Sequence, residues 1–315
     1  MKSLACYFTL LATVAINVVA SVPAQAQRAR VFVSVSGDDG NPCTGGSPCK
    51  TFQHAHDVVL AGGEISVLDS GGYGTLTINK ALSIVAVGVQ ASIAIPSGGV
   101  GIAINAGSND KVSLRGLTLD GQGVGQDGID FNSGEALTVE DCVVRNMLNA
   151  GLNFVSAATI DETLDISNSS FFDNGLDGVV IATKSSGGIY AAIERTRLHG
   201  NSIGLNVLGN TPGGTGTLYV AVTDSVSSNN NTGFALGASA GGSPSNLSLT
   251  HTLVEGNVTG ILVQGNSTAF WLAQSTVSLN KTFGFHNIGG VINSYGDNYI
   301  ANALNSGALT SVSRQ

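Results

Sequence analysis

From about residue 100 the sequence repeats itself, and this repeat restricts the fold more than any other feature. A glycine followed by an apolar residue, any residue and usually a second apolar residue returns every 23 to 29 residues. The eight copies begin at Gly101, Gly128, Gly151, Gly178, Gly204, Gly233, Gly260 and Gly284. Each copy has the two-residue period of a strand with one buried face, and no part of this region sustains a helical period. Short strands and turns at this repeat length predict a solenoid whose coils pack on their neighbours.

A second recurring unit follows most of the glycine units and often ends in asparagine. Stacked coils lie about 4.8 Å apart, so equivalent side chains lie above one another in columns. Asparagine tolerates left-handed backbone at a turn and can hydrogen-bond its neighbours there. We therefore expect a structural column of Asn174, Asn201, Asn230, Asn257 and Asn280. Beside it we expect an inward apolar column of Phe171, Leu198, Val254 and Val277, and a column of small residues from Cys142 and Ser169 to Ser275.

The first 26 residues have the organisation of a secretory signal peptide. Lys2 is followed by a mostly apolar stretch, residues 4–22, and by the small-residue sequence Ala24-Gln25-Ala26. A membrane anchor is the alternative, but polar residues interrupt the stretch and no basic cluster follows it. We expect cleavage after Ala26, a secreted or periplasmic protein, and no membrane association afterwards.

Charge and composition narrow the possible partners. The chain has 13 basic and 21 acidic residues, a net charge of −8, and its few lysines and arginines are scattered. Nucleic acid is therefore a poor candidate partner. Only 11% of the residues are charged and 43% are hydrophobic, which predicts a folded chain. We expect a monomer.

The segment before the repeats differs from them. Thr51–Gly63 places apolar residues on one helical face, with Thr51 as the expected N-cap and Gly62 as the expected C-cap. Such a helix would cover the open end of the first coil. We expect a disulfide loop and cap helix in residues 27–63, and a β-helix of nine to ten coils in residues 64–315.

Three cysteines remain after signal cleavage. Cys43 and Cys49 lie six residues apart in a turn-rich segment, which in an oxidising compartment favours a disulfide. A zinc pair is the alternative, but no second Cys/His pair at finger-like spacing follows. Cys142 falls in the column of small residues, where a free, buried thiol is expected.

These features together resemble a known family. Pro48-Cys49-Lys50-Thr51-Phe52, the cap helix, Gly63-Glu-Ile-x-Val67, Gly72-Tyr73 and the asparagine turns are similar to bacterial secreted right-handed β-helix repeat proteins of the pectin-lyase-like fold. The resemblance implies an all-β, right-handed parallel β-helix with a short N-terminal capping helix. It implies little about activity, because this fold carries lyases, hydrolases, epimerases and adhesins.

Residues 127–130, Asp-Gly-Ile-Asp, resemble part of the polygalacturonase strand motif. The second Asp pair, Gly-His-Gly and Arg-x-Lys of that family are missing here, as is the Trp-x-Asp-His of pectate lyases. A hydrolase needs two suitably spaced carboxyls, and a lyase needs a base with a charge sink. The candidate catalytic residues, which fall on three successive coils, are Asp127, Asp130, Arg145, Asp173 and Asp177.

The alternation of the first strand turns one column outward, and its polar end could hydrogen-bond sugar hydroxyls. This column is Asp130, Asn153, Val180, Asn206, Ala235, Leu262 and His286. The sequence favours a β-helix protein that presents an outer face to a polysaccharide or cell-surface glycan, without catalysis and without a cofactor. The alternatives are a lyase or hydrolase acting on an acidic polysaccharide, with calcium only in the lyase case, and a purely structural envelope component.

Overall fold

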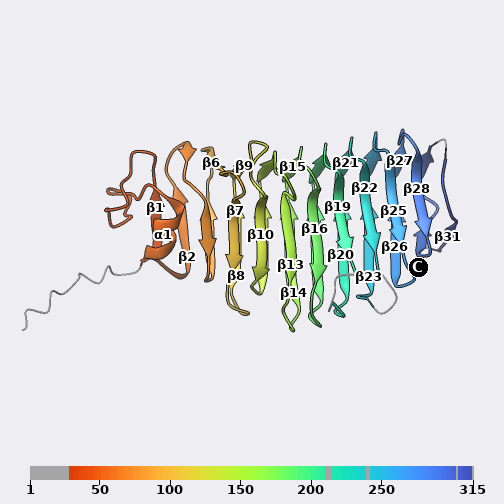
Figure 1. Ribbon diagram of the computed structural model, residues 1–315, viewed down its shortest axis with the longest axis horizontal. Coiled ribbons are helices and arrows are strands. Elements are labelled where there is room, and N and C mark those ends of the chain that lie inside the picture. The colour runs from red at the N-terminus through yellow and green to blue at the C-terminus, as the bar shows by residue number, and fades with distance from the viewer. Residues whose placement is uncertain (1–27, 210–213, 239–241, 303, 314–315) are drawn as a thin grey trace, which may run out of the picture.

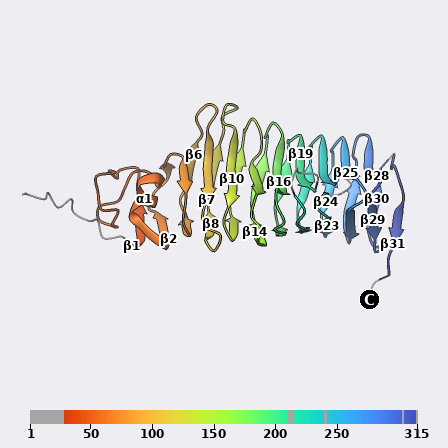
Figure 2. The same cartoon turned by 60° about the horizontal axis from the view of Figure 1, so that its bottom comes forward.

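The computed structural model describes residues 28–209, 214–238, 242–302 and 304–313, so the predicted signal peptide lies outside the described residues. The described strands form three parallel sheets that run along the molecule (Figures 1 and 2). In chain order, each coil gives one strand to sheet 1, a short strand to sheet 2 and one strand to sheet 3. The predicted fold class, an all-β parallel β-helix with one short N-terminal helix, is confirmed.

In the described residues the three sheets have 12, 10 and 9 strands. Sheet 1 contains β1 (Arg28–Val33), β2 (Val59–Val67), β5 (Leu82–Val85), β8 (Lys111–Arg115), β11 (Ala136–Glu140), β14 (Glu162–Ser167), β17 (Ile189–Glu194), β20 (Leu218–Thr223), β23 (Ser245–Thr250), β26 (Thr268–Ala273), β29 (Val291–Ser294) and β31 (Leu309–Ser311). Sheet 2 contains β3 (Gly71–Gly72), β6 (Ala91–Ala94), β9 (Leu117–Asp120), β12 (Val143–Arg145), β15 (Ser170–Phe172), β18 (Arg197–His199), β21 (Val226–Ser228), β24 (Leu253–Glu255), β27 (Thr276–Ser278) and β30 (Tyr299–Ala301). Sheet 3 contains β4 (Leu76–Ile78), β7 (Val100–Asn105), β10 (Asp127–Ser133), β13 (Leu152–Ser156), β16 (Asp177–Thr183), β19 (Ile203–Leu208), β22 (Thr232–Gly237), β25 (Thr259–Gln264) and β28 (Phe283–Ile288).

The core is a continuous apolar interior enclosed by the three sheets. Strand alternation turns every second side chain inward, and parallel register places like residues above one another. Phe131 and Phe154 illustrate this, because they are paired in register and stack with ring centroids 4.1 Å apart. The apolar column that contains Phe171 and Leu198 is likewise fully buried. The length of the solenoid therefore rests on residues that repeat coil by coil.

A ladder of asparagine side chains runs along the turn between sheets 2 and 3. The Nδ2 of Asn174 donates to the Oδ1 of Asn201 at 3.0 Å. The same side-chain bond then links Asn201, Asn230, Asn257, Asn280 and Asn302 in turn. Each oxygen also accepts the backbone N–H of the preceding ladder residue, so it satisfies buried turn groups that would otherwise lack partners. Asn302, which the sequence analysis did not include, extends the ladder by one coil.

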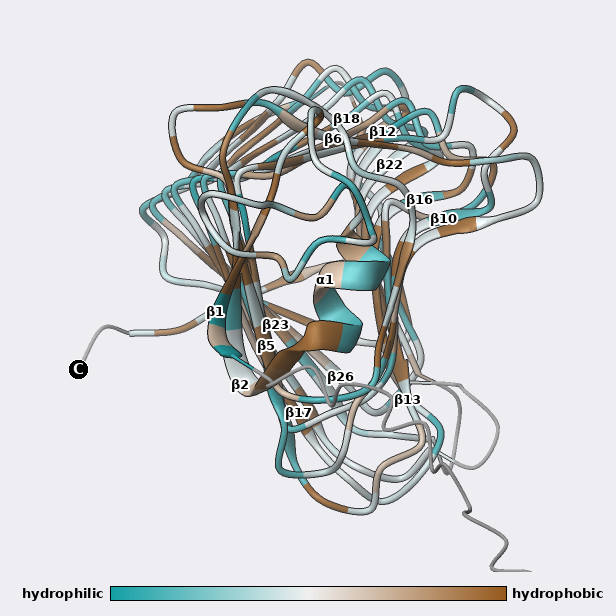
Figure 3. Cartoon of the chain, turned by 90° about the vertical axis from the view of Figure 1, so that its left-hand side faces the viewer, coloured by the Kyte–Doolittle hydropathy of each residue, from teal (hydrophilic) through white to brown (hydrophobic). Residues whose placement is uncertain are grey.

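The N-terminal end shows two differences from expectation. Helix α1 spans Phe52–Val58 and has Thr51 as its N-cap, as predicted, but it ends at Val59, where β2 begins. Gly62 is not a C-cap; its φ of +75° lies within β2, where the register with β1 shifts. The β-helix therefore begins before residue 64, because Arg28–Val33 already pairs with β2 in parallel. Figure 3 shows α1 across the N-terminal end of the stacked coils.

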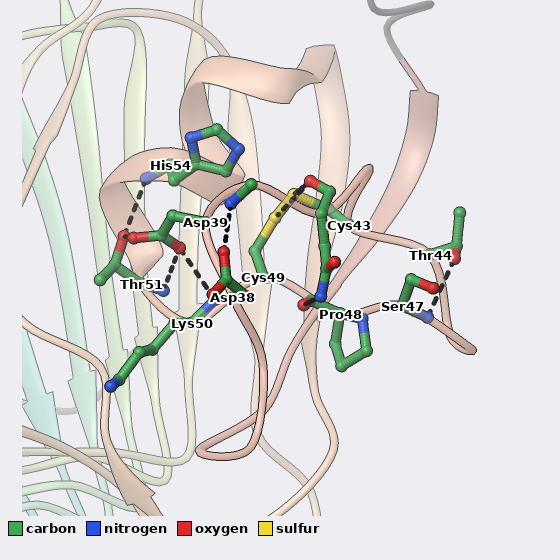
Figure 4. Close-up of a disulfide and its surroundings, with 12 residues drawn as sticks. Asp38, Asp39, Cys43, Thr44, Ser47, Pro48, Cys49, Lys50, Thr51 and His54 are labelled. Atoms are coloured by element: carbon green, nitrogen blue, oxygen red, sulfur yellow. Dashed lines mark hydrogen bonds between the residues drawn. A yellow bond between two sulfur atoms is a disulfide. The ribbon is translucent and has the colours of Figure 1, made fainter.

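The disulfide loop lies against this helix (Figure 4). Cys43 and Cys49 are bonded and fully buried, which confirms the expected disulfide. Asp39 joins the loop to the helix, since it accepts the backbone N–H of Lys50 and of Thr51. Cys142 is free and buried, also as expected, and burial raises the pKa of its thiol to about 12.

Candidate functional site

Three of the predicted catalytic acids lie in sheet 3, and each is held by a neighbouring coil. Asp127 accepts the backbone N–H of Ala150 at 3.0 Å, and Asp130 accepts the side-chain amide of Asn153 at 2.9 Å. Asp177 accepts the side-chain amide of Asn206 at 3.2 Å. Burial raises the pKa of Asp127, with a further contribution from Asp130, and burial raises the pKa of Asp177 to about 6. Asp127 and Asp177 can therefore hold a proton more readily than surface acids do.

The other two candidates belong to sheet 2 and its turn. Arg145 ends β12, where its Nε and Nη2 both lie 3.0 Å from one carboxylate oxygen of Asp120. The guanidinium of Arg145 therefore pairs with Asp120 and not with any of the candidate acids of sheet 3. Asp173 has a φ of +55° at the residue before the ladder, a position that Gly200 and Gly256 fill in later coils. Its place is explained by left-handed turn geometry.

The described residues contain one group of at least three His, Cys, Asp or Glu donor atoms that all lie within 4.8 Å of one another. It comprises Cys43, Cys49 and His54, and both sulfurs are already joined in the disulfide. The predicted acids of sheet 3 form no such group with one another or with Asp173.

The outward column of sheet 3 has the register expected from the sequence. Asp130 pairs with Asn153, and the pairing continues coil by coil to Leu262 and His286. However, the middle of the column is covered, because Val180, Asn206 and Ala235 are each less than 10% exposed. This column does not offer one continuous open face.

A groove lies instead on the outer face of sheet 1, which the sequence analysis did not select. It has a volume of about 760 Å³ and crosses β14, β17, β20, β23 and β26. Its floor follows one register column in which small residues succeed one another: Ala192 pairs with Ala221, which pairs with Ser248. Small side chains at these positions leave the space that larger neighbours enclose. Such a volume is typical of a ligand site.

Two aromatic pairs border this floor. Tyr190 and Tyr219, on neighbouring coils, stack with ring centroids 5.2 Å apart and remain almost half exposed. Trp271 and Tyr295 lie 6.2 Å apart at the other end, where they also line a second hollow of about 580 Å³ with Val312 and Ser313. Exposed aromatic groups of this kind on a groove are typical of binding surfaces.

The polar groups of the groove are mostly uncharged. Asn246 lies between the two aromatic pairs, with Ser248 beside it in the floor and Thr250 on the far edge. The side chains of Asn246 and Thr250 make no hydrogen bond to another described residue, so their donors and acceptors are free for a ligand. Asp165, at the β14 end, is the one acidic residue of the lining.

The sequence does contain a signal for this site. Ile189-Tyr-Ala-Ala-Ile193 and Leu218-Tyr-Val-Ala-Val222 share one pattern, with the tyrosine and the alanine on the outward face of adjacent coils. The unit lies between the glycine and asparagine units, whose spacing carries no information about it. An exposed tyrosine repeated at coil spacing marks a stacked surface pair.

In the described part of the chain, no helix has the length and apolar character needed to cross a membrane.

The stacked coils, the asparagine ladder and the outer groove define a solenoid protein of the parallel β-helix class. A family model described as the right handed beta helix region matches residues 100–282, and the chain belongs to this family. No curated protein sequence matches the chain significantly.

Solved structures with the same fold include two with high coverage of this chain. Pectate lyase Pel9A is 17% identical with a TM-score of 0.58, and the match covers 91% of this chain and 80% of that one. XylC, in complex with xylose, is 9% identical with a TM-score of 0.57, over 84% of this chain and 68% of that one. Likeness at these identities establishes the fold, while activity has to be argued from the site.

Proposed function

We propose that the protein binds a glycan chain along the outer groove of sheet 1 and does not depolymerise it. The observation that carries this proposal is that one exposed and one half-buried aromatic pair border a floor of small and hydroxyl-bearing residues. Sugar rings have apolar C–H faces that pack on aromatic groups and hydroxyl edges that need hydrogen-bond partners. Asn246, Ser248 and Thr250 can supply those partners.

The length of the groove favours an oligosaccharide over a single sugar. From β14 to β26 the floor crosses four strand spacings, or about 19 Å. The second hollow beyond Trp271 and Tyr295 continues the same face. A ligand that crosses several coils can contact both aromatic pairs at once. Two of the structures that share the fold, a pectate lyase and a complex with xylose, are consistent with a carbohydrate ligand.

We further propose that the protein acts outside the cytoplasm, as a secreted or periplasmic monomer. The predicted signal peptide and the Cys43–Cys49 disulfide support this location. No metal or cofactor enters the binding proposal.

A polysaccharide lyase or hydrolase is the second candidate, and its best support is in sheet 3. The raised pKa of Asp177, about 6, gives a carboxyl that could act as a general acid. Asp127 and Asp130 would have to supply the second group. A lyase would use Ca²⁺ and would need a base other than Arg145, whose guanidinium is paired with Asp120.

The binding proposal is tested by titrating the purified protein with panels of neutral and acidic oligosaccharides and comparing it with the Trp271→Ala variant. Trp271 lines both the groove and the second hollow, so loss of its stacking ring should weaken binding about tenfold or more. Tyr299→Ala is the matched control, because Tyr299 is an exposed aromatic residue in sheet 2, away from the groove. The proposal fails if no glycan binds, or if both variants bind as the wild type does.

A further inference from the structure

The charges around the groove are distributed unevenly. Among its described lining residues there is no lysine, arginine or histidine, and Asp165 is the one carboxylate. Asp165 is exposed, and its side chain has no hydrogen bond or ion pair with another described residue. An unpaired carboxylate at the end of an otherwise uncharged groove gives the groove a negative potential.

Three basic side chains in or next to sheet 1 do not offset this charge, because carboxylates outside the groove pair with them. Arg195 is paired with Glu194. Arg115 lies within 3.5 Å of both Glu140 and Asp141, and Lys111 is paired with Glu135 at 3.1 Å. Each cation is thus matched by a carboxylate outside the groove. The chain as a whole carries a net charge of −8, which strengthens repulsion of polyanions.

We propose that the groove selects uncharged glycans and that Asp165 is the residue that excludes polyuronates from it. This inference rests on the proposed glycan-binding function and specifies the substrate class of the same site. Recognition of a uronate normally requires a cation or a bound metal opposite the sugar carboxylate. Here the polar groups that face the ligand are neutral amide and hydroxyl groups, which suit sugar hydroxyls.

The position of Asp165 explains why this one residue would be sufficient to exclude polyuronates from the groove. It occupies the floor column directly before Ala192 and Ala221, in register with both. A chain that follows the floor toward β14 therefore passes over this carboxylate. Two like charges about 4 Å apart in water repel by about 1 kcal/mol, which corresponds to about a fivefold change in affinity. Selectivity against an acidic sugar at this position follows from the like charge.

The test compares one neutral and one acidic ligand, cellohexaose and hexagalacturonate, on wild type, Asp165→Asn and Asp165→Lys by titration calorimetry. Asp165→Asn should bind hexagalacturonate about fivefold more tightly than wild type at low ionic strength, and Asp165→Lys more tightly still. Added salt should reduce both gains, and each gain is read as the change in the ratio of hexagalacturonate affinity to cellohexaose affinity. Glu255→Gln is the matched control, because it removes the same charge from β24 in sheet 2.

The outcomes separate this inference from the proposed function. The selectivity proposal is wrong if wild type binds hexagalacturonate as tightly as the neutral ligand, or if the Asp165 variants leave the ratio of the two affinities unchanged. In either case the groove remains the site as long as Trp271→Ala weakens binding. If Glu255→Gln gives the same gain as Asp165→Asn, the effect is one of net charge and Asp165 has no special role. If Trp271→Ala binds every ligand as wild type does, both proposals fail.

Discussion

Tyr190 and Tyr219 stand on adjacent coils in parallel register, with ring planes only 14° apart. The 5.2 Å between their centroids is close to the strand spacing, so the sheet itself sets the stack. Their hydroxyls make no hydrogen bond to another described residue. The pair is therefore a preformed apolar surface with two free polar tips.

The stack predicts which part of the tyrosine a ligand uses. Tyr219→Phe keeps the ring and should retain glycan affinity within about threefold, whereas Tyr219→Ala should lose about tenfold or more. Titration with the best-binding oligosaccharide measures both. Equal losses in the two variants would mean that the hydroxyl, rather than the ring, makes the contact.

The asparagine ladder predicts a large stability difference between two polar residues. Asn230 donates to the backbone oxygen of Leu198 and accepts the backbone N–H of Asn201, so Asn230→Ala leaves buried groups unpaired. We expect a loss of about 1–3 kcal/mol in the free energy of unfolding. The exposed Gln264, changed to Ala, should be nearly neutral. Similar shifts of the two variants in thermal melts would contradict the ladder as a source of stability.

A buried carboxyl predicts how stability depends on pH. Glu162 is 2% exposed and accepts the hydroxyl of Ser156, and burial raises its pKa from 4.5 to about 7. The folded state therefore holds this proton more tightly than the unfolded state. The stabilisation that this proton gives to the folded state is fully present below about pH 4.5. It is lost as pH rises to about 7, where the free energy of unfolding falls by at most about 1.4 kcal/mol per pH unit.

Glu162→Gln is the variant that isolates this contribution, because glutamine stays uncharged. It should match wild type near pH 4.5 and exceed it in melting temperature at pH 8. A difference in melting temperature that stays constant across this pH range would show that the protonation of Glu162 does not change on unfolding.

The binding proposal predicts no turnover of uronate polymers. Incubation with polygalacturonate, with and without Ca²⁺, should give neither unsaturated nor reducing-end products above background. Asp130→Ala serves as the control, since it removes the candidate acid in the outward column of sheet 3. A product that forms with wild type and disappears in this variant would establish catalysis.

The cysteines predict a simple labelling pattern. Native protein should resist thiol reagents, because Cys142 is 1% exposed and its thiolate is disfavoured. After unfolding without reductant of protein that begins at Gln27, and so lacks Cys6, one thiol per chain should react, and peptide mapping should find it at Cys142. A peptide that links Cys142 to Cys43 or Cys49 would refute the assignment.

Column residues could be predicted from the sequence because each has a counterpart one coil away. Spacing alone predicts Phe171 and Leu198 in the interior, and both are fully buried. The end of α1 could not be predicted in this way. Gly62 has the chemistry of a helix C-cap, but pairing of Val59 and Glu64 with β1 extends the strand backward and places that glycine where the register shifts.

The groove was missed for a different physical reason. Its shape depends on the relation between columns: Ala192 and Ala221 leave space only because tyrosines rise beside them and Trp271 closes the end. The column that contains Asp130 shows the reverse. Its outward direction can be predicted from strand alternation, but the burial of Val180 within it cannot. Burial on an outer face depends on neighbouring segments rather than on strand alternation.

The hydrogen bonds of the asparagine ladder all point the same way, from Asn174 toward Asn302. Their amide dipoles therefore add along the axis of the molecule, and each bond polarises the next. Each coil within the ladder presents an oxygen to the coil before it and an N–H to the coil after it. Duplication of the segment from Asn201 to Asn229 would insert a coil that meets both demands, so this ladder allows the protein to be lengthened by whole coils without leaving a donor unpaired.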